Sequence, residues 1–507
     1  MTGKVSEVKT LADLFANRPA AGRPALLFDE QAYTYAGLDA VSNQAAQCLI
    51  GQGVRPGDIV CQVIGSRPEL IINLFGILKC GAIYAPLNPS LTERELAAQL
   101  ADCRASLVIA DTELVGRKVE LAVAALPGCR VLPVAELSAR LKDGPPPPSL
   151  PIDPDSHAVL CYTSGTGGQA KGVQLSHRNI LANARQVLDR TGLKPEDRLL
   201  VIMPIFHANG LCNQVVVPFL AGASIVLRRR FVLEEFWPAV AQYRPTYFTA
   251  VPTILSRLLE ASEPPPQAQR SSLRFARTGA APLSIEVQQR FEERFGLPVI
   301  VSYGLTEATC TVTMNPPTLE DRKLGSVGIA LEGVKVRVLG PDGTELPVGT
   351  VGEIVTQGPC VMLGYLGLPE ETAEAIPDGW LRTGDLGYVD KDGYLFLSDR
   401  KKDLIIRGGE NISPREVEEA LYAHPTVAEA AVLGLPDPVY GEQVVAFVVL
   451  RDQSRPQADV VEELLAHCRV RLARFKVPAH IEVLHDMPKN AVGKIAKREL
   501  RERSTSG

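Results

Sequence analysis

Helical patterns alternate with short runs of β-branched residues through most of the chain. Residues 58–65 and 82–88 have the pattern of strands and residues 67–81 that of a helix, and the series continues with a helix over 92–105 and a strand over 106–111. Such alternation is typical of parallel sheets that are covered by helices. The sequence therefore predicts an α/β fold, and its 507 residues are enough for more than one folding unit.

The C-terminal part has a different pattern. Residues 383–399 predict β-hairpins around the turn 390-DKDG-393, and the charged run 399-DRKKD-403 follows. The remaining stretch, about a hundred residues of short strands and helices, suits a small α+β domain, so we expect a boundary near residue 400. The proline-rich segment 144–151 predicts a surface connector, either between two α/β lobes or within one large domain.

Charge and cysteine content exclude several classes of protein. The net charge of -5 offers no general attraction to nucleic acid, whose binding needs clustered Lys and Arg. The ten cysteines form no CxxC pair and no Cys/His cluster at metal spacing. We therefore expect reduced thiols and a cytoplasmic protein rather than a disulfide framework or a zinc site.

Two segments bear on membranes and export. The N-terminal residues have no apolar core of signal-peptide length, so we do not expect export. The most apolar run, residues 70–88, is interrupted by Asn73 and Lys79 and contains a proline near its end. It predicts a buried helix that leads into a strand, not a transmembrane segment.

A loop made mostly of glycines and hydroxyl residues, 161-CYTSGTGGQAKG-172, lies between a predicted strand over 158–163 and a predicted helix over 176–190. Its backbone N–H groups, hydroxyls and lysine could surround phosphate oxygens. It is not a Walker P-loop, because Ala170 stands where that motif needs glycine and Gly172 follows Lys171. Taken alone, such a loop also fits a plain connection.

Four further segments occur after this loop: 303-YGLTE-307, 383-TGD-385, 399-DRKKD-403 and 488-PKNAVGK-494. Together, in this order and spacing, the five segments resemble the adenylate-forming superfamily from about Leu11 to Leu500. The stretches 407–421 and 325–333 resemble its acyl-CoA synthetase branch most, and 235–253 also resembles small-acid CoA ligases of the oxalate and coumarate type.

The resemblance implies a large, multi-subdomain N-terminal domain over 1–401 that binds ATP and the acyl substrate, and a small mobile α+β domain over 402–507, with the hinge near Lys402. It also implies two half-reactions. A carboxylic acid and ATP give acyl-AMP and pyrophosphate, and a thiol, usually that of CoA, then displaces AMP.

By the same resemblance, the glycine-rich loop holds the β- and γ-phosphates of ATP. Its residues in this role are Thr163, Ser164, Gly165, Thr166, Gly167, Gly168 and Lys171. Thr306 is expected to contact the α-phosphate, and Glu307 to bind Mg²⁺, a cation that prefers oxygen ligands. Without the resemblance, Glu307 fits a helix cap equally well.

The resemblance also implies how the rest of ATP is bound. The adenine would lie between 303-YG-304, which is Tyr303 and Gly304, and a turn formed by Gly279, Ala280 and Ala281. Asp385 would accept hydrogen bonds from the ribose hydroxyls, with Arg400 beside it, although Asp385 alone could simply shape a turn. Lys494, which composition alone makes a surface charge, would stabilise the adenylation transition state.

For the second half-reaction, the resemblance makes Lys402 the hinge. It also makes 407-RGG-409, which is Arg407, Gly408 and Gly409, the wall of a pantetheine channel. His207 would be the gate between the acyl pocket and this channel, whereas a lone histidine among apolar residues is otherwise a core group. The loop departs from the superfamily pattern at Gly167 and Ala170, which predicts weaker ATP binding or faster loop motion.

The acyl substrate is the least determined part. The segments expected to line its pocket are mostly small and uncharged, and Ser302, not arginine, precedes the YG pair. We therefore expect a fatty or aryl acid more than a charge-specific dicarboxylate, although Asn209 could still bind a polar acid, with ATP, Mg²⁺ and CoA as the other reactants. Loading of a carrier protein's phosphopantetheine, a non-catalytic nucleotide-binding protein and a homodimer stay open.

Overall fold

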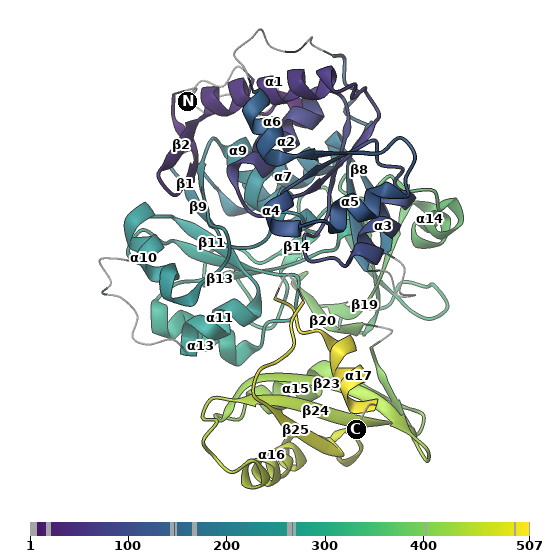
Figure 1. Ribbon diagram of the computed structural model, residues 1–507. Coiled ribbons are helices and arrows are strands. Elements are labelled where there is room, and N and C mark those ends of the chain that lie inside the picture. Colours follow the sequence, from purple (N-terminus) through teal and green to yellow (C-terminus); the bar gives the residue numbers. More distant parts are fainter. Residues whose placement is uncertain are drawn as a thin grey trace.

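The computed structural model describes residues 8–16, 22–141, 147, 150–164, 170–260, 266, 270–400, 403–490 and 493–505. Over these residues the chain folds into four sheets and the helices that pack on them (Figure 1). Two large sheets and a smaller one form the N-terminal part, and a fifth of the chain forms a separate α+β part at the C-terminus. The predicted fold class is confirmed.

The first large sheet has nine strands in the order β15-β14-β13-β12-β11-β9-β10-β1-β2. Its central strands are parallel, and β2, β14 and β15 are antiparallel at its edges. The strands are β1 Pro24–Phe28, β2 Gln31–Thr34, β9 Arg198–Val201, β10 Ser224–Leu227, β11 Tyr247–Ala250, β12 Phe275–Thr278, β13 Val299–Tyr303, β14 Thr313–Met314 and β15 Ile329–Ala330.

The second large sheet has seven strands in the order β18-β8-β7-β4-β3-β5-β6. Strands β4, β3, β5 and β6 are parallel, as the alternating pattern predicts, and β8 and β18 add an antiparallel edge. The strands are β3 Ile59–Val63, β4 Ile83–Pro86, β5 Leu107–Ala110, β6 Arg130–Pro133, β7 His157–Ser164, β8 Ala170–Ser176 and β18 Gly364–Tyr365.

Helices shared by the two large sheets carry the main core. Ten of the twelve residues of α2 are buried, which explains why this segment looks membrane-like in sequence although it lies inside a globular domain. No helix among the described residues is long and apolar enough to cross a membrane. The helices of this part that precede residue 200 are α1 Tyr35–Gly51, α2 Pro68–Lys79, α3 Glu93–Asp102, α4 Thr112–Val115, α5 Lys118–Ala124, α6 Val134–Arg140 and α7 His177–Thr191, after the short turn η2 Leu11–Asp13.

The segment after β9 contains a π-helical turn, η3, between two short helices. This irregular stretch packs against α7, and its Asn213 belongs to the site described below. The helices from here to the end of the N-terminal part are α8 Ala208–Leu211, η3 Cys212–Val216, α9 Val217–Ala221, α10 Leu233–Tyr243, α11 Pro252–Glu260, α13 Ile285–Phe295, η4 Thr306–Ala308, α14 Pro369–Ala375 and η5 Pro377–Gly379.

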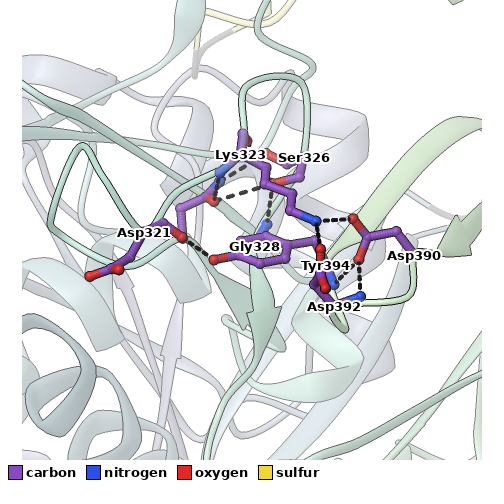
Figure 2. Close-up of polar contacts among 8 residues, drawn as sticks. Asp321, Lys323, Ser326, Gly328, Asp390, Asp392 and Tyr394 are labelled. Atoms are coloured by element: carbon purple, nitrogen blue, oxygen red, sulfur yellow. Dashed lines mark hydrogen bonds and ion pairs between the residues drawn. The ribbon is translucent and has the colours of Figure 1, made fainter.

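A four-stranded antiparallel sheet, β16-β17-β19-β20, ends the N-terminal part. Its β19–β20 hairpin is fixed at its turn, because the Lys323 ammonium lies between Asp390 and Asp392, and the Tyr394 hydroxyl donates to the carbonyl of Asp321 (Figure 2). The predicted turn at 390–393 is confirmed. The strands are β16 Lys335–Leu339, β17 Gly352–Gln357, β19 Leu381–Val389 and β20 Leu395–Arg400.

The C-terminal sheet has the order β22-β21-β24-β23, with β25 parallel to β24. Separate apolar clusters cover its two faces, one under α15 and α16 and the other under α17 (Figure 1). The elements are β21 Ile405–Arg407, β22 Glu410–Ile412, α15 Pro414–Tyr422, β23 Val427–Asp437, β24 Gly441–Leu450, α16 Gln457–Arg471, η6 Arg474–Lys476, β25 His480–Leu484 and α17 Lys497–Thr505.

One local prediction is wrong. The glycine-rich loop does not run from a strand directly into a helix, because β8 lies between them and pairs antiparallel with β7. The sequence of residues 170–176, AKGVQLS, mixes small, polar and apolar residues and contains a glycine, so it does not look like a strand. Its pairing partner is the preceding strand, β7. Lys402 lies outside the described residues, so the division at 401 and 402 stays a prediction.

Candidate active site

Three side chains that the sequence places in the ribose and adenine sites are in direct contact. Tyr303, at the end of β13, donates its hydroxyl to Oδ2 of Asp385 at 2.7 Å. Arg400 Nε lies 3.0 Å from Oδ1 of the same carboxylate, and the two residues are opposite each other on β19 and β20. Burial, reinforced by the charge of Asp385, raises the pKa of Tyr303, so its phenol stays a neutral donor.

Lys494 comes from the C-terminal part and joins this group. Its loop is docked on α11, because the hydroxyl of Thr253 donates to the carbonyl of Gly493 at 2.8 Å. Burial first and the charge of Arg400 second lower the pKa of Lys494, to about 8, while the charge of Asp385 acts in the opposite direction. We call Tyr303, Asp385, Arg400 and Lys494 the nucleotide end of the site.

His207 lies between β9 and α8, close enough to Lys494 for the charge of the lysine to affect the pKa of the imidazole. Burial lowers the pKa of His207 to about 4, and Lys494 acts in the same direction. Its Nε2 is buried and has no partner among the described residues, and its ring lies 4.5 Å from that of Phe206. The imidazole is therefore neutral at pH 7, and the predicted gate residue lies beside the predicted catalytic lysine.

The flanks of the glycine-rich loop meet the predicted metal ligand. Thr163 and Lys171 are partners across β7 and β8. Lys171 Nζ lies 4.8 Å from the ring centroid of Tyr365, whose hydroxyl donates to Glu307 Oε1 at 3.1 Å. Tyr365 was missed by sequence reasoning, because it reaches this place only through the pairing of β18 with β8.

Part of the predicted phosphate loop cannot be placed. Gly165, Thr166, Gly167 and Gly168 and the side chain of Ser164 lie outside the described residues. Ala170, where the loop departs from the superfamily pattern, begins β8 opposite Ser164. The expectations about the loop's phosphate contacts therefore stay predictions.

The predicted adenine segments lie close together, with little room for side chains. A Cβ on Gly304 would lie 1.9 Å from the carbonyl oxygen of Cys310, and one on Gly279 would lie 2.9 Å from that of Ser302. Ala280 has a φ of 69°, which is strained for a residue with a Cβ. Ala281 follows in the same turn, and Thr306 begins η4 directly before Glu307.

The predicted pantetheine segment is not brought to this group. Arg407 Nη1 donates to the carbonyl of Phe475 at 3.1 Å, and its guanidinium stacks on Tyr440, both in the C-terminal part. Gly408 and Gly409 form the turn between β21 and β22 with positive φ. In this arrangement the C-terminal part presents Lys494, not 407–409, to the site.

A second polar group lies beyond His207, and we call it the acyl end: Asn209, Asn213, Thr249, Arg277 and Cys310. Asn213 Nδ2 donates to Asn209 Oδ1 at 2.7 Å and approaches Cys310 Sγ. Cys310 and Cys212 lie close enough to Arg277 to affect its pKa, which burial lowers. Sequence reasoning missed Arg277; the available signal was an arginine at a core position of the strand 275-FART-278.

The fold and the nucleotide end agree with the family that the sequence resembles. Residues 13–366 match the family described as "AMP-binding enzyme", and residues 416–494 match "AMP-binding enzyme C-terminal domain". The chain belongs to the AMP-binding enzyme family, as the sequence resemblance predicts.

Named relatives are similar over almost the whole chain. A sulfoacetate–CoA ligase of Cupriavidus necator is 38% identical, with 97% of each chain covered. A feruloyl-CoA synthase of an Amycolatopsis species is 41% identical, with 93% of this chain and 94% of the relative covered. The crystal structure of the anthranilate CoA ligase AuaEII with anthranoyl-AMP superimposes with a TM-score of 0.92 at 28% identity, covering 99% of each chain.

Proposed function

We propose that the protein is an acyl-CoA synthetase. In the first step, an oxygen of the acid's carboxylate attacks the α-phosphorus of ATP, and the bond to the bridging oxygen breaks to release pyrophosphate. In the second, the CoA sulfur attacks the acyl carbon and AMP leaves. The docking of the Lys494 loop on α11 carries this proposal, because it brings a C-terminal lysine within electrostatic range of the Asp385–Arg400 pair, a ribose-type site.

The roles of the nucleotide end follow from its chemistry. The Asp385 carboxylate can accept hydrogen bonds from ribose hydroxyls through lone pairs that Tyr303 and Arg400 leave free. The Lys494 ammonium, largely protonated at pH 7, would stabilise the charge that develops around the α-phosphorus. Neutral His207 would separate the acyl pocket from the thiol.

Magnesium would arrive with ATP. The described residues contain no group of three or more His, Cys, Asp or Glu that could hold a metal ion by itself. The single carboxylate of Glu307 fits a cation whose other ligands are phosphate oxygens and water. Mg²⁺ would neutralise phosphate charge there, while Tyr365 orients the carboxylate and Lys171 adds a positive charge.

CoA as acceptor is supported by the names of the relatives, which are CoA ligases and a CoA synthase of similar length. Their acids, sulfoacetate and ferulate, differ strongly in size and charge, so the relatives alone do not choose the acid. The ten free cysteines support a cytoplasmic location.

The test is an acid panel with ATP and Mg²⁺, in which pyrophosphate and acyl thioester are measured with and without CoA. The proposal expects pyrophosphate release that depends on the acid, and a thioester only when CoA is present. Pyrophosphate release without any CoA thioester would favour a carrier protein as acceptor. Nucleotide binding without pyrophosphate release for any acid would refute the proposal.

A further inference from the structure

The acyl end contains a buried positive charge without a protein partner. Arg277 is only 2% exposed, its Nε is enclosed without a hydrogen bond, and no ion pair joins it to any residue that the structure describes. A guanidinium stays charged in proteins, and burying it unpaired costs free energy. The guanidinium of Arg277 would therefore be stabilised by an anion that the described part of the protein does not supply.

The Arg277 side chain points toward the residues of the acyl end. Arg277 on β12 is in register with Thr249 on β11, so both side chains leave the same face of the parallel sheet. The groups that affect its pKa after burial are Cys310, Tyr247 and Cys212, and none of them is a carboxylate. Cys310 contacts Asn213, which in turn donates to Asn209 two residues after His207.

Other polar atoms on this face also lack partners. The hydroxyl of Tyr247 and Oγ1 of Thr249 are buried without a hydrogen bond, as is Oδ1 of Asn213. Buried polar groups in folded proteins are nearly always paired, so several unpaired ones beside a buried arginine indicate a polar ligand. A purely apolar acyl chain would leave all of them unpaired.

We propose that Arg277 determines specificity for a short carboxylic acid that carries a second anionic group, a carboxylate or a sulfonate. The inference rests on the proposed function and narrows its substrate class. A carboxylate or sulfonate offers the two oxygens that a guanidinium binds in parallel. Arg277 also lies two residues before the Gly279 turn, about 7 Å along the strand, so an acid that pairs with Arg277 and reacts with a nucleotide bound at this turn would be short.

This proposal runs against the expectation of a fatty or aryl acid. That expectation considered the residue before the YG pair, Ser302, on the neighbouring strand β13. The structure shows a positive charge two strand positions before Gly279 instead, on β12. The charged residue is therefore on β12, whereas the sequence motif considered only the neighbouring strand β13.

The experiment compares acids of matched length: malonate with propanoate, and succinate and 3-sulfopropanoate with butanoate. Acid-dependent pyrophosphate release gives kcat/KM for each acid with the wild-type protein, Arg277→Met and Arg277→Lys. The wild type should prefer the dianions within each set. Arg277→Met should lose at least about 30-fold for a dianion and not for its monoacid, and Arg277→Lys should recover part of the loss.

Arg117→Met is the matched control, because its side chain is 84% exposed and it removes the same charge. A wild type that prefers the monoacids overturns the inference without any variant. A preference for dianions that Arg277→Met retains overturns the role of Arg277. If no acid releases pyrophosphate, the proposed function itself fails. The sulfonate and carboxylate arms tell which anion fits.

Discussion

The two ends of the active site are built in opposite ways. At the nucleotide end the polar groups hold one another: Tyr303 and Arg400 share the carboxylate of Asp385, and Lys494 lies within electrostatic range of this pair. At the acyl end Arg277 Nε and Thr249 Oγ1 are buried without partners, as is the neighbouring Tyr247 hydroxyl. The nucleotide end is therefore assembled by the protein's own groups, whereas the acyl end has polar atoms that a substrate would pair under the inference above.

The largest expected effect concerns two buried arginines. Arg322 pairs with Glu292, with side chains 8% and 12% exposed, so Arg322→Met should cost about 3–5 kcal/mol of folding free energy by leaving that buried carboxylate without its charged partner. Arg277→Met removes an unpaired charge and should cost nothing or raise stability. Thermal melting of both variants measures the difference. Equal destabilisation would mean that Arg277 has a structural partner, which would break the comparison.

The next effect tests the nucleotide end. Asp385→Ala removes the acceptor shared by Tyr303 and Arg400, together with the expected ribose contact, so kcat/KM for ATP should fall by roughly 30-fold or more. The control is Asp392→Ala, on the turn of the same hairpin, where an exposed carboxylate pairs with Lys323. A control loss as large as that of Asp385→Ala would show that the hairpin, not the carboxylate, matters.

A pH profile sharpens the role of Lys494. The pKa of about 8 means that the ammonium is present below pH 8 and is lost as the pH rises through that value. We therefore expect kcat/KM for pyrophosphate release to fall above pH 8 by about tenfold per pH unit. Residual activity of Lys494→Arg should lack this alkaline limb, because guanidinium stays protonated. The same limb in the variant would assign it to another group.

The smallest expected effect concerns Tyr365. Tyr365→Phe removes one hydrogen bond to Glu307 but keeps the ring under Lys171. The loss is about 1 kcal/mol, or roughly fivefold in kcat/KM for ATP with Mg²⁺. Titration with Mg²⁺ should show a higher half-saturating concentration in the variant. An unchanged Mg²⁺ dependence would mean that Tyr365 does not orient Glu307 for the metal.

The same contrast explains what the sequence could predict. The nucleotide end consists of short contiguous segments such as 303-YGLTE-307 and 383-TGD-385, whose order and spacing can be recognised in the sequence itself. The helix–strand alternation likewise predicted β3, α2, β4, α3 and β5. Local patterns of this kind need no knowledge of strand order.

The remaining features depend on tertiary pairing. Strand β8 is recognisable only by its antiparallel pairing with β7, and Tyr365 only by that of β18 with β8. Arg277 stands in an apolar strand, and its meaning depends on which face of β12 meets Cys310 and Cys212. When the proposed partner of a residue is a ligand, no second residue in the sequence indicates the interaction.

Lys494 reaches the nucleotide end from the C-terminal part, and the proposed adenylation step depends on it more than on any other residue. The direct test measures the two half-reactions of Lys494→Ala separately. Pyrophosphate release should slow by about 10²- to 10³-fold, while thioester formation from supplied acyl-AMP and CoA should stay near the wild-type rate. Equal slowing of both half-reactions would contradict the account, because Lys494 would then act on the fold or on both steps rather than on adenylation.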